Sequence, residues 1–182
     1  MVCYLIRHGK DDETIRGGWS HHGLVPDGIA QVQHLAQELV QQKLDVKCIY
    51  SSDLQRAQES ADILAGALHL PVYYSSEFRE INNGDLAGIP NDLANEKYPG
   101  LYYASLSYDE CYPNGESPKQ FFSRIHDAWT NFKKEVEHDS ILVTHGGVIE
   151  AILCIENHIK YTNTQKHFST PHAKVITLNL AK

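Results

Sequence analysis

Three polar motifs in this sequence place a histidine or an arginine just after a short apolar run. Arg7 and His8 follow the first run directly. Arg56 comes a few residues after the second run, and His145 and Gly146 follow the fourth. Arginine offers a planar fork of donors that matches phosphate oxygens, and a neutral imidazole is a nucleophile near neutral pH. If the fold brings these motifs together, they form an anion site that contains an imidazole.

The chemistry that this combination favours is phosphoryl transfer to His8. Surrounding cations lower the proton affinity of an imidazole, which keeps its nitrogen free to attack. The phosphoryl group in transit spreads negative charge over its oxygens, where Arg7, Arg56 and His145 would donate hydrogen bonds. A leaving alkoxide also needs a proton. Glu80 follows the third apolar run and is the candidate acid, provided that burial keeps it protonated.

The elements that must position these residues alternate in type along the chain. Short runs with the composition of strands cover residues 2–6, 46–50, 71–74, 140–144 and 174–180. Amphipathic helical patterns lie between them, at residues 28–42, 54–68, 117–136 and 147–156. This alternation predicts a three-layer α/β/α fold with a mostly parallel central sheet. Ligands bind beyond the carboxyl ends of such strands, so the motifs should meet at one sheet edge.

Two helix starts can be predicted from capping residues. Ser52 and Asp53 are suitable caps for the second helix, whose apolar stripe begins at Leu54. Ser117-Pro-Lys-Gln is a capping box with proline at the first helical position. In the first helix, Ile29 and Val40 belong to the apolar stripe that should face the core.

The length of 182 residues favours a single domain over residues 1–182. Residues 81–115 are rich in Gly, Asn, Pro and Tyr, and predict an irregular, lid-like insertion with one short helix at 91–97. Its tyrosines form either a small satellite core or an aromatic wall over the pocket: Tyr98, Tyr102, Tyr103, Tyr108 and Tyr112.

Composition excludes several classes of partner. The chain carries 16 Lys and Arg against 23 Asp and Glu, a formal charge of -7, with no basic run, so nucleic acid and anionic membranes are poor partners. No apolar stretch reaches the ~18 residues of a membrane span, and the N-terminus lacks signal-peptide features. The four cysteines form no close pair, which favours a reduced, cytoplasmic protein. His21-His22 lacks a third ligand at zinc spacing, so we expect no metal and no cofactor.

The motifs together resemble the histidine phosphatase superfamily, the phosphoglycerate mutase-like clan. Five segments match in order: Arg7-His8-Gly9, 51–57, 78–84, Gly115-Glu116-Ser117 and His145-Gly146-Gly147. One such tripeptide is weak support, whereas five in order over nearly the whole chain are strong. The resemblance implies that His8 becomes phosphorylated, that Arg7, Arg56, His145 and Gly146 surround the phosphate, that Glu80 donates the proton, and that no metal takes part.

The segment after the nucleophile motif departs from the family pattern. Lys10 and Asp11 stand where the family usually has a hydroxyl residue and then an asparagine, and Thr14 falls near the asparagine position. Lys10, Thr14 and Arg16 are the candidate substrate-binding residues of this segment. The departures leave the phosphate pocket intact and bear on the identity of the substrate.

The expected activity is hydrolysis of a phosphomonoester of a small metabolite. From Glu80 to Glu116 there are seven acidic residues and one lysine, which should repel a second phosphate and disfavours a mutase. The alternatives are an α-ribazole-phosphate phosphatase, which a flat, tyrosine-rich lid would suit, and a protein-phosphohistidine phosphatase, which has little need of Glu80. A non-catalytic phosphoprotein-binding module is the weakest alternative. The sequence leaves the oligomeric state open.

Overall fold

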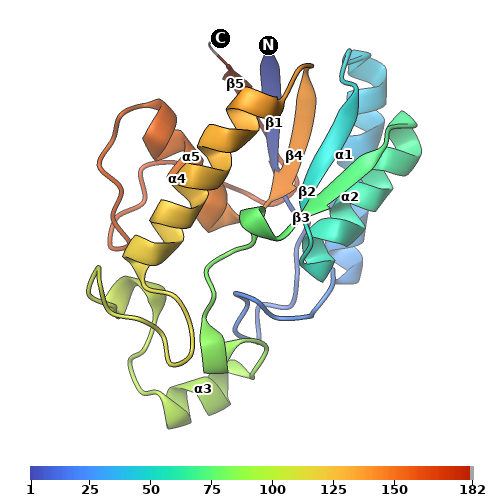
Figure 1. Ribbon diagram of the computed structural model, residues 1–182. Helices are drawn as coiled ribbons and strands as arrows, with labels where there is room; N and C mark the ends of the chain where they lie inside the picture. Colours follow the sequence, from blue (N-terminus) through green and yellow to red (C-terminus); the bar gives the residue numbers. More distant parts are fainter. Residues whose placement is uncertain (181–182) are drawn as a thin grey trace.

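A five-stranded sheet forms the centre of the molecule in the computed structural model, which describes residues 1–180 (Figure 1). Its strands are β1 (Val2–Arg7), β2 (Cys48–Ser52), β3 (Val72–Ser75), β4 (Ser140–Thr144) and β5 (Val175–Asn179). They lie in the order β3-β2-β4-β1-β5, and only β5 runs antiparallel to its neighbour. The mostly parallel sheet is therefore confirmed, and each predicted strand lies within two residues of its observed position.

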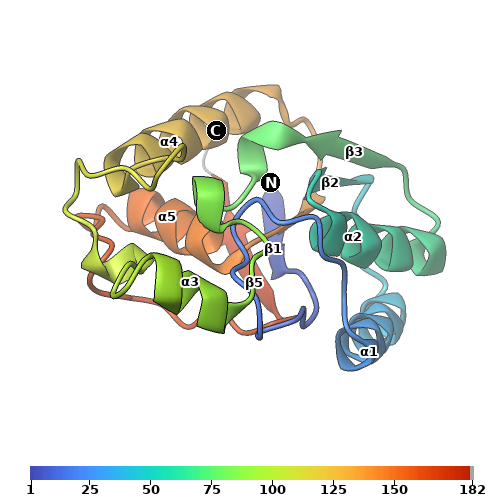
Figure 2. The same cartoon turned by 90° about the horizontal axis from the view of Figure 1, so that it is seen from below.

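Two pairs of helices cover the two faces of the sheet. Helices α1 (Pro26–Gln42) and α2 (Gln55–Leu68) pack on one face, and α4 (Pro118–Glu135) and α5 (Gly146–Glu156) pack on the other (Figures 1 and 2). Side chains alternate between the faces along β1, because Leu5 belongs to the α4–α5 core and Ile6 to the α1–α2 core. This is the predicted three-layer α/β/α arrangement.

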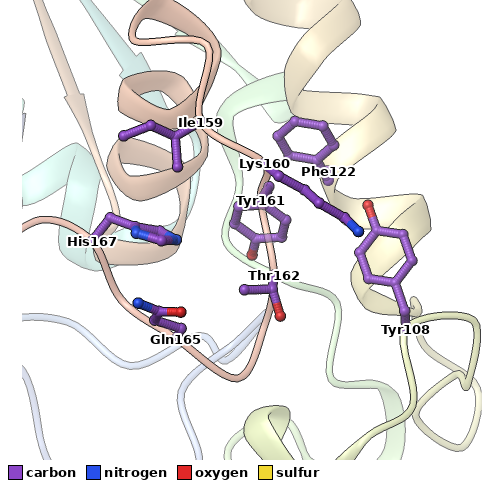
Figure 3. A pocket seen from close by; sticks show the side chains of 8 residues that line it. All are labelled: Tyr108, Phe122, Ile159, Lys160, Tyr161, Thr162, Gln165 and His167. Carbon is purple, nitrogen blue, oxygen red and sulfur yellow. The ribbon is translucent and has the colours of Figure 1, made fainter.

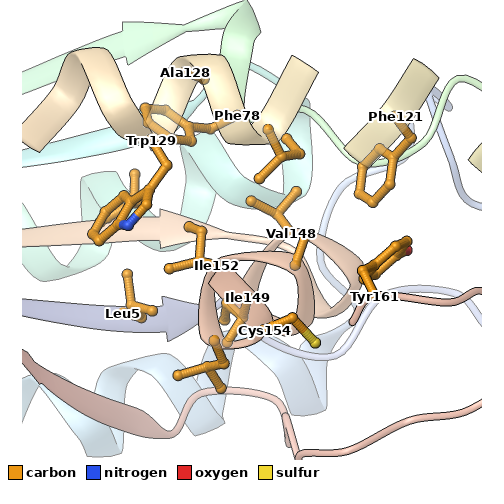
Figure 4. Packing of buried hydrophobic residues seen from close by; sticks show 14 of the residues in the cluster. Leu5, Phe78, Phe121, Ala128, Trp129, Val148, Ile149, Ile152, Cys154 and Tyr161 are labelled. Atoms are coloured by element: carbon orange, nitrogen blue, oxygen red, sulfur yellow. The ribbon is translucent and has the colours of Figure 1, made fainter. Parts of the chain in front are cut away.

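The core between the sheet and helices α4 and α5 is rich in aromatic side chains (Figure 4). Trp129 of α4 stacks on Phe132, with ring centroids 5.3 Å apart, and Phe78 meets Phe132 edge to face at 5.7 Å. On the opposite side of the sheet, the predicted stripe of α1 is only partly buried. Ile29 and Val40 are exposed, since the buried face is the narrower row Val32, Leu35, Ala36 and Leu39.

One predicted helix cap is confirmed and the other is wrong. Ser117 Oγ accepts the N–H of Gln120, and the Gln120 side chain accepts the N–H of Ser117, as a capping box requires. Helix α2, however, begins after Leu54 with no side-chain cap. Ser52 and Asp53 are used by other contacts: the Asp53 carboxylate is held by the guanidinium of Arg79, and Ser52 lies against a histidine described below.

The irregular segment 81–115 lies beyond the carboxyl ends of the parallel strands, with helix α3 (Asn91–Lys97) at its outer edge (Figures 1 and 2). The predicted short helix has the observed bounds. Main-chain hydrogen bonds link Arg16 to Ile89 and Gly88, so the segment after β1 is joined to this insertion. No helix within residues 1–180 is both long enough and apolar enough to span a membrane.

The tyrosines of this segment do not form a single group. Tyr112 is buried in the core, and Tyr98 and Tyr103 pack against it. Tyr102 and Tyr108 remain exposed. Part of the cluster therefore anchors the insertion, as a satellite core would, while two rings stay at the surface.

Candidate active site

The carboxyl ends of β1, β2 and β4 bring the predicted residues together. His8 directly follows β1, Arg56 lies in the first turn of α2, and His145 directly follows β4. Arg56 Nε is 3.3 Å from His8 Nε2, and the rings of His8 and His145 have centroids 5.1 Å apart. All three side chains are buried. Two imidazoles and a guanidinium from distant parts of the chain thus share one small space.

The orientation of His8 is fixed by its own main chain. Its Nδ1 lies 2.7 Å from the carbonyl oxygen of Gly9, which can only accept, so Nδ1 carries the proton. The unprotonated nitrogen is therefore Nε2, whose lone pair accepts a hydrogen bond from Arg56 Nε at 3.3 Å. Burial lowers the pKa of His8 well below the usual histidine value, and the nearby Arg56 and Arg7 act in the same direction. His8 is consequently a neutral imidazole with an available nucleophilic nitrogen.

Main-chain oxygens orient both arginines, and Arg56 also contacts a hydroxyl and the Asp11 carboxylate. Arg56 donates to the carbonyl oxygen of Gly18 at 2.8 Å and to Ser20 Oγ at 3.3 Å. Arg7 donates to the carbonyl oxygen of Thr170 at 3.0 Å, and its Nε is buried without a hydrogen-bond partner among residues 1–180. Unpaired buried donors of this kind are costly unless a ligand accepts from them.

His145 is oriented by Ser52, one of the two residues that the sequence analysis assigned to a helix cap. Ser52 Oγ accepts the N–H of Leu54, so its own proton is free to donate to His145 Nε2, 2.8 Å away. The neutral ring then carries its proton on Nδ1, which is buried and has no partner in the described chain. Burial, followed by Arg56, lowers the pKa of His145 well below the usual value. This geometry makes Nδ1–H of His145 a donor for an anion.

Glu80 reaches the same edge from the segment that follows β3. Its carboxyl oxygens accept the N–H of Gly147, at 3.0 Å, and of Ile81, at 3.1 Å. A Cβ atom at position 147 would lie 2.4 Å from Glu80 Oε1, so glycine is what allows this close approach. Burial lowers the pKa of Arg7 and of Arg56, whereas the nearby Glu80 carboxyl raises both pKa values. Glu80 is therefore close to the two guanidiniums.

Arg124 of α4 holds the backbone that carries Glu80. Its guanidinium donates to the carbonyl oxygens of Glu77, Arg79 and Glu80 at 2.8, 3.1 and 3.1 Å. It also forms a bidentate pair with Glu116, at 2.8 and 2.9 Å. Sequence reasoning missed this residue, because an arginine within an amphipathic helix carries no local signal of such a role.

The candidate substrate-binding residues have different surroundings. Lys10 Nζ lies 3.7 Å from Glu13, and Thr14 is exposed and hydrogen-bonded to Asp12. Arg16 lies over the ring of Tyr102 at 4.1 Å. Its terminal nitrogen donates to Asn95 at 2.8 Å, while its Nε is buried with no partner within residues 1–180. Gly146 is close to the arginine site, since a Cβ there would lie 3.5 Å from Arg7 Cζ.

Two further side chains lie beside His8 that are not among the candidate site residues. His172, in the loop before β5, has its ring centroid 5.4 Å from that of His8. Asp11 lies 3.4 Å from Arg56 Nε and 3.8 Å from His172 Nε2. In the sequence, Asp11 stands out only as a departure from the family pattern. By contrast, His21 and His22 are both exposed.

A separate hollow of about 690 Å³ lies between α4, the insertion and the segment after α5 (Figure 3). Tyr108, Phe122, Tyr161 and His167 are among the residues that line it. None of its lining residues belongs to the histidine and arginine cluster. Tyr108, one of the two exposed tyrosines of the insertion, therefore borders this hollow.

Comparison with known proteins gives the family. The model of the histidine phosphatase superfamily, branch 1, matches residues 3–182. A putative phosphoserine phosphatase 2 of Hydrogenobacter thermophilus is 28% identical over 165 residues, which cover 88% of this chain and 80% of that protein. A 2,3-bisphosphoglycerate-dependent phosphoglycerate mutase of Bradyrhizobium diazoefficiens is 27% identical, with 85% and 80% of the two chains covered.

Among solved structures, a putative alpha-ribazole-5'-P phosphatase of Escherichia coli has a similar fold. The TM-score is 0.77 with 25% identity, and the match covers 88% of this chain and 81% of that chain. The expected resemblance and fold class are thereby confirmed. The family match over nearly the whole chain establishes that this protein belongs to the histidine phosphatase superfamily.

Proposed function

We propose that the protein hydrolyses phosphomonoesters of small metabolites through a phosphohistidine intermediate on His8. The observation that carries the proposal is the state of His8. It is a buried neutral imidazole, with Nδ1–H bound to its own main chain and Nε2 facing a guanidinium. A nucleophile needs the unprotonated nitrogen, and the phosphoryl group needs the cation, which exchanges its hydrogen bond to Nε2 for one to a phosphoryl oxygen.

In the first step, His8 Nε2 attacks phosphorus and the ester P–O bond breaks. Arg7, Arg56 and Nδ1–H of His145 donate to the phosphoryl oxygens, on which negative charge accumulates. Glu80 acts as the acid once the bound phosphate takes its place as counter-ion of Arg7 and Arg56 and the carboxylate has taken up a proton; it then gives this proton to the leaving alkoxide, which departs as an alcohol. The Gly9 carbonyl stabilises the positive charge that develops on His8, because it accepts the Nδ1–H bond.

In the second step, water replaces the alcohol and the roles reverse. Glu80, now a carboxylate, accepts a proton from water as the water oxygen attacks phosphorus. The N–P bond breaks and its electron pair returns to His8 Nε2. Phosphate leaves, and both His8 and Glu80 have returned to their starting states. No metal or cofactor is required by this cycle.

The charge of the insertion favours a substrate with a single phosphate. Seven acidic residues against one lysine lie between Glu80 and Glu116. Arg124 pairs with Glu116, and Lys119, just beyond the segment, pairs with Asp109 at 2.9 Å, so part of this charge is neutralised. The net negative charge that remains on the insertion still disfavours a second phosphate. The similarity to phosphatases and to mutases is nearly equal, at 28% and 27% identity, so charge rather than identity separates the two activities.

Of the candidate substrate-binding residues we retain Arg16, because its Nε is buried with no hydrogen-bond partner within residues 1–180 and its guanidinium lies over the exposed ring of Tyr102. A flat leaving group that contacts Tyr102 would suit this place, which supports an α-ribazole-phosphate phosphatase as the second candidate. A protein-phosphohistidine phosphatase is less well supported, since an imidazole leaving group has little need of the acid that Glu80 supplies.

The test is hydrolysis by the purified protein in the presence of EDTA. We expect turnover of p-nitrophenyl phosphate and of a panel of monophosphates, with bisphosphates turned over more slowly. His8→Ala should abolish turnover. Full activity of His8→Ala would refute the mechanism, and preference for a bisphosphate would refute the charge argument. Tight binding of a phosphopeptide with no turnover would instead indicate a non-catalytic binding module.

A further inference from the structure

His172 is a titratable side chain beside the nucleophile that the proposed phosphoryl transfer does not use. Its Nε2 is buried and has no hydrogen-bond partner within residues 1–180. Its ring centroid lies 5.4 Å from that of His8, and one ring nitrogen of each histidine lies within 4.8 Å of the other. A buried polar atom without a partner is costly, and a ligand that pairs with Nε2 would remove that cost.

The sheet order explains why His172 lies at this place. Strand β1 lies between β4 and β5, and β5 runs antiparallel to it, so the start of β5 meets the end of β1. His145 directly follows β4, and His172 shortly precedes β5. The nucleophile therefore has one histidine beside it from each neighbouring strand, with ring centroids at 5.1 and 5.4 Å. An oxyanion bound at His8 can thus be contacted from both strands.

The loop that carries His172 is attached to Arg7 on both sides of the ring. The Arg7 side chain donates to the carbonyl oxygen of Thr170 at 3.0 Å, and the N–H of Ala173 donates to the carbonyl oxygen of Arg7 at 2.9 Å. Ala173 has a φ of 49°, in the left-handed region that a residue with a Cβ adopts only at a cost. Such a conformation persists where the surrounding contacts impose it, so the position of His172 is fixed by the fold.

The charged groups around His172 determine its protonation state. Burial lowers its pKa and Arg7 lowers it further, whereas Asp11 raises it. Glu13 also raises the pKa, and Lys10 lowers it. His172 is therefore a neutral imidazole near neutral pH. Asp11 Oδ1, 3.8 Å from Nε2, can only accept, which favours the tautomer that carries its proton on Nε2.

The partner that this Nε2–H suits is an anion. Asp11 is too distant to accept the proton, since 3.8 Å exceeds the length of a hydrogen bond. Its other carboxylate oxygen lies 3.4 Å from Arg56 Nε, so its charge is partly balanced. The negative charge that spreads over the oxygens of a phosphoryl group in transfer needs several donors. His172 adds one to those already described, which are Arg7, Arg56 and His145.

We propose that His172 is a further catalytic residue, whose Nε2–H donates a hydrogen bond to a phosphoryl oxygen during transfer to and from His8. The proton remains on His172, so no bonds form or break other than those of the two steps above. The inference rests on the proposed function, because it needs a phosphoryl group at His8. A residue that contacts this group affects every ester alike, whereas one that acts through Glu80 affects mainly esters with a poor leaving group.

The test compares kcat for an alkyl phosphate and for p-nitrophenyl phosphate in His172→Leu and His172→Gln. Leucine removes the donor, and glutamine places an N–H close to the position of Nε2. His172→Leu should lower kcat for both esters by the same factor, about 10- to 100-fold, the equivalent of one hydrogen bond to a charged group. His172→Gln should stay within about threefold of the wild type, because the donor is kept.

Calorimetric binding of inorganic phosphate gives a second readout that needs no turnover. The dissociation constant should rise by at least about 10-fold in His172→Leu and recover in His172→Gln. His167→Leu is the matched control, because it removes an exposed histidine of the same segment that lines the separate hollow. It should leave both kcat values and the phosphate affinity unchanged.

Unchanged rates and phosphate affinity in His172→Leu would overturn the inference and leave the proposed function standing. A loss confined to the alkyl ester, or one that glutamine does not recover, would overturn it as well. Thermal unfolding identifies a variant that does not fold; if His172→Leu is one, His172→Ala takes its place with the same expected losses. A wild-type protein that neither binds phosphate nor hydrolyses either ester would overturn the proposed function itself.

Discussion

Arg124 gives a prediction that depends on the whole arrangement around Glu80. Replacing it with methionine keeps an unbranched apolar stem and removes the guanidinium. The bonds lost are those to the carbonyl oxygens of Glu77, Arg79 and Glu80, together with both bonds to Glu116. The segment that carries the acid then loses its attachment to α4, although Trp19 Nε1–H still donates to the Glu80 carbonyl oxygen at 2.7 Å.

The size of the effect follows from what the acid contributes. General acid catalysis supplies ~10²- to 10⁴-fold, and a displacement of about 1 Å can cost ~10²-fold. We therefore expect Arg124→Met to lower kcat for an alkyl phosphate by about 10²-fold. For p-nitrophenyl phosphate, whose leaving group hardly needs a proton, the loss should stay within about threefold. Arg124 would thus act as a positioning residue, through Glu80.

The assay compares kcat for the two esters in four proteins: wild type, Arg124→Met, Glu80→Gln and the double variant. If Arg124 acts through Glu80, the double variant should be little slower than Glu80→Gln alone. Lys133→Met is the control, because it removes a cation of the same helix that pairs with Glu156 away from the site. Equal losses on both esters, or additive losses in the double variant, would refute the reasoning.

Three further predictions concern Glu80 and His145. Gly147→Ala should displace the Glu80 carboxyl, since its Cβ would lie 2.4 Å from Oε1, and should reproduce the selective loss on alkyl esters; an unchanged ratio of the two kcat values would contradict this. Ser52→Ala removes the bond that fixes the His145 tautomer and should weaken inhibition by inorganic phosphate by about 10-fold, the equivalent of one hydrogen bond. His145 is buried with its pKa lowered, so below pH ~6.5 the unfolded chain binds a proton that the folded chain does not, and stability falls as the pH falls. His145→Asn should reduce this slope by up to about 1.4 kcal/mol per pH unit in urea unfolding between pH 5 and 6.5, and an unchanged slope would show that the ring is not held neutral.

The positions of the principal site residues follow from the sequence because they depend on short-range rules. Each lies within a few residues of the end of a strand, and the strands could be located from their apolar runs. Parallel strands bring their carboxyl ends to one edge, so Arg7, Arg56, Glu80 and His145 had to converge once the sheet was parallel.

The features of the site and core that could not be predicted depend on contacts between segments that are distant in the sequence. Ser52 had the character of a helix cap, yet its hydroxyl contacts His145, 93 residues away. His172 lies next to His8 because β5 pairs with β1, a register that no local pattern of the last segment reveals. The apolar pattern of α1 predicts a wider buried face than the structure has, because only packing decides that Ile29 and Val40 stay exposed.

The most direct test of the account is to trap the intermediate on His8. The protein is mixed with an excess of substrate, quenched within milliseconds in alkali, in which phosphohistidine survives, and analysed by mass spectrometry after digestion. The account predicts one phosphoryl group, on Nε2 of His8, that forms in Glu80→Gln and is absent from His8→Ala. Phosphate on another residue, or continued turnover with no phosphorylated histidine, would contradict it.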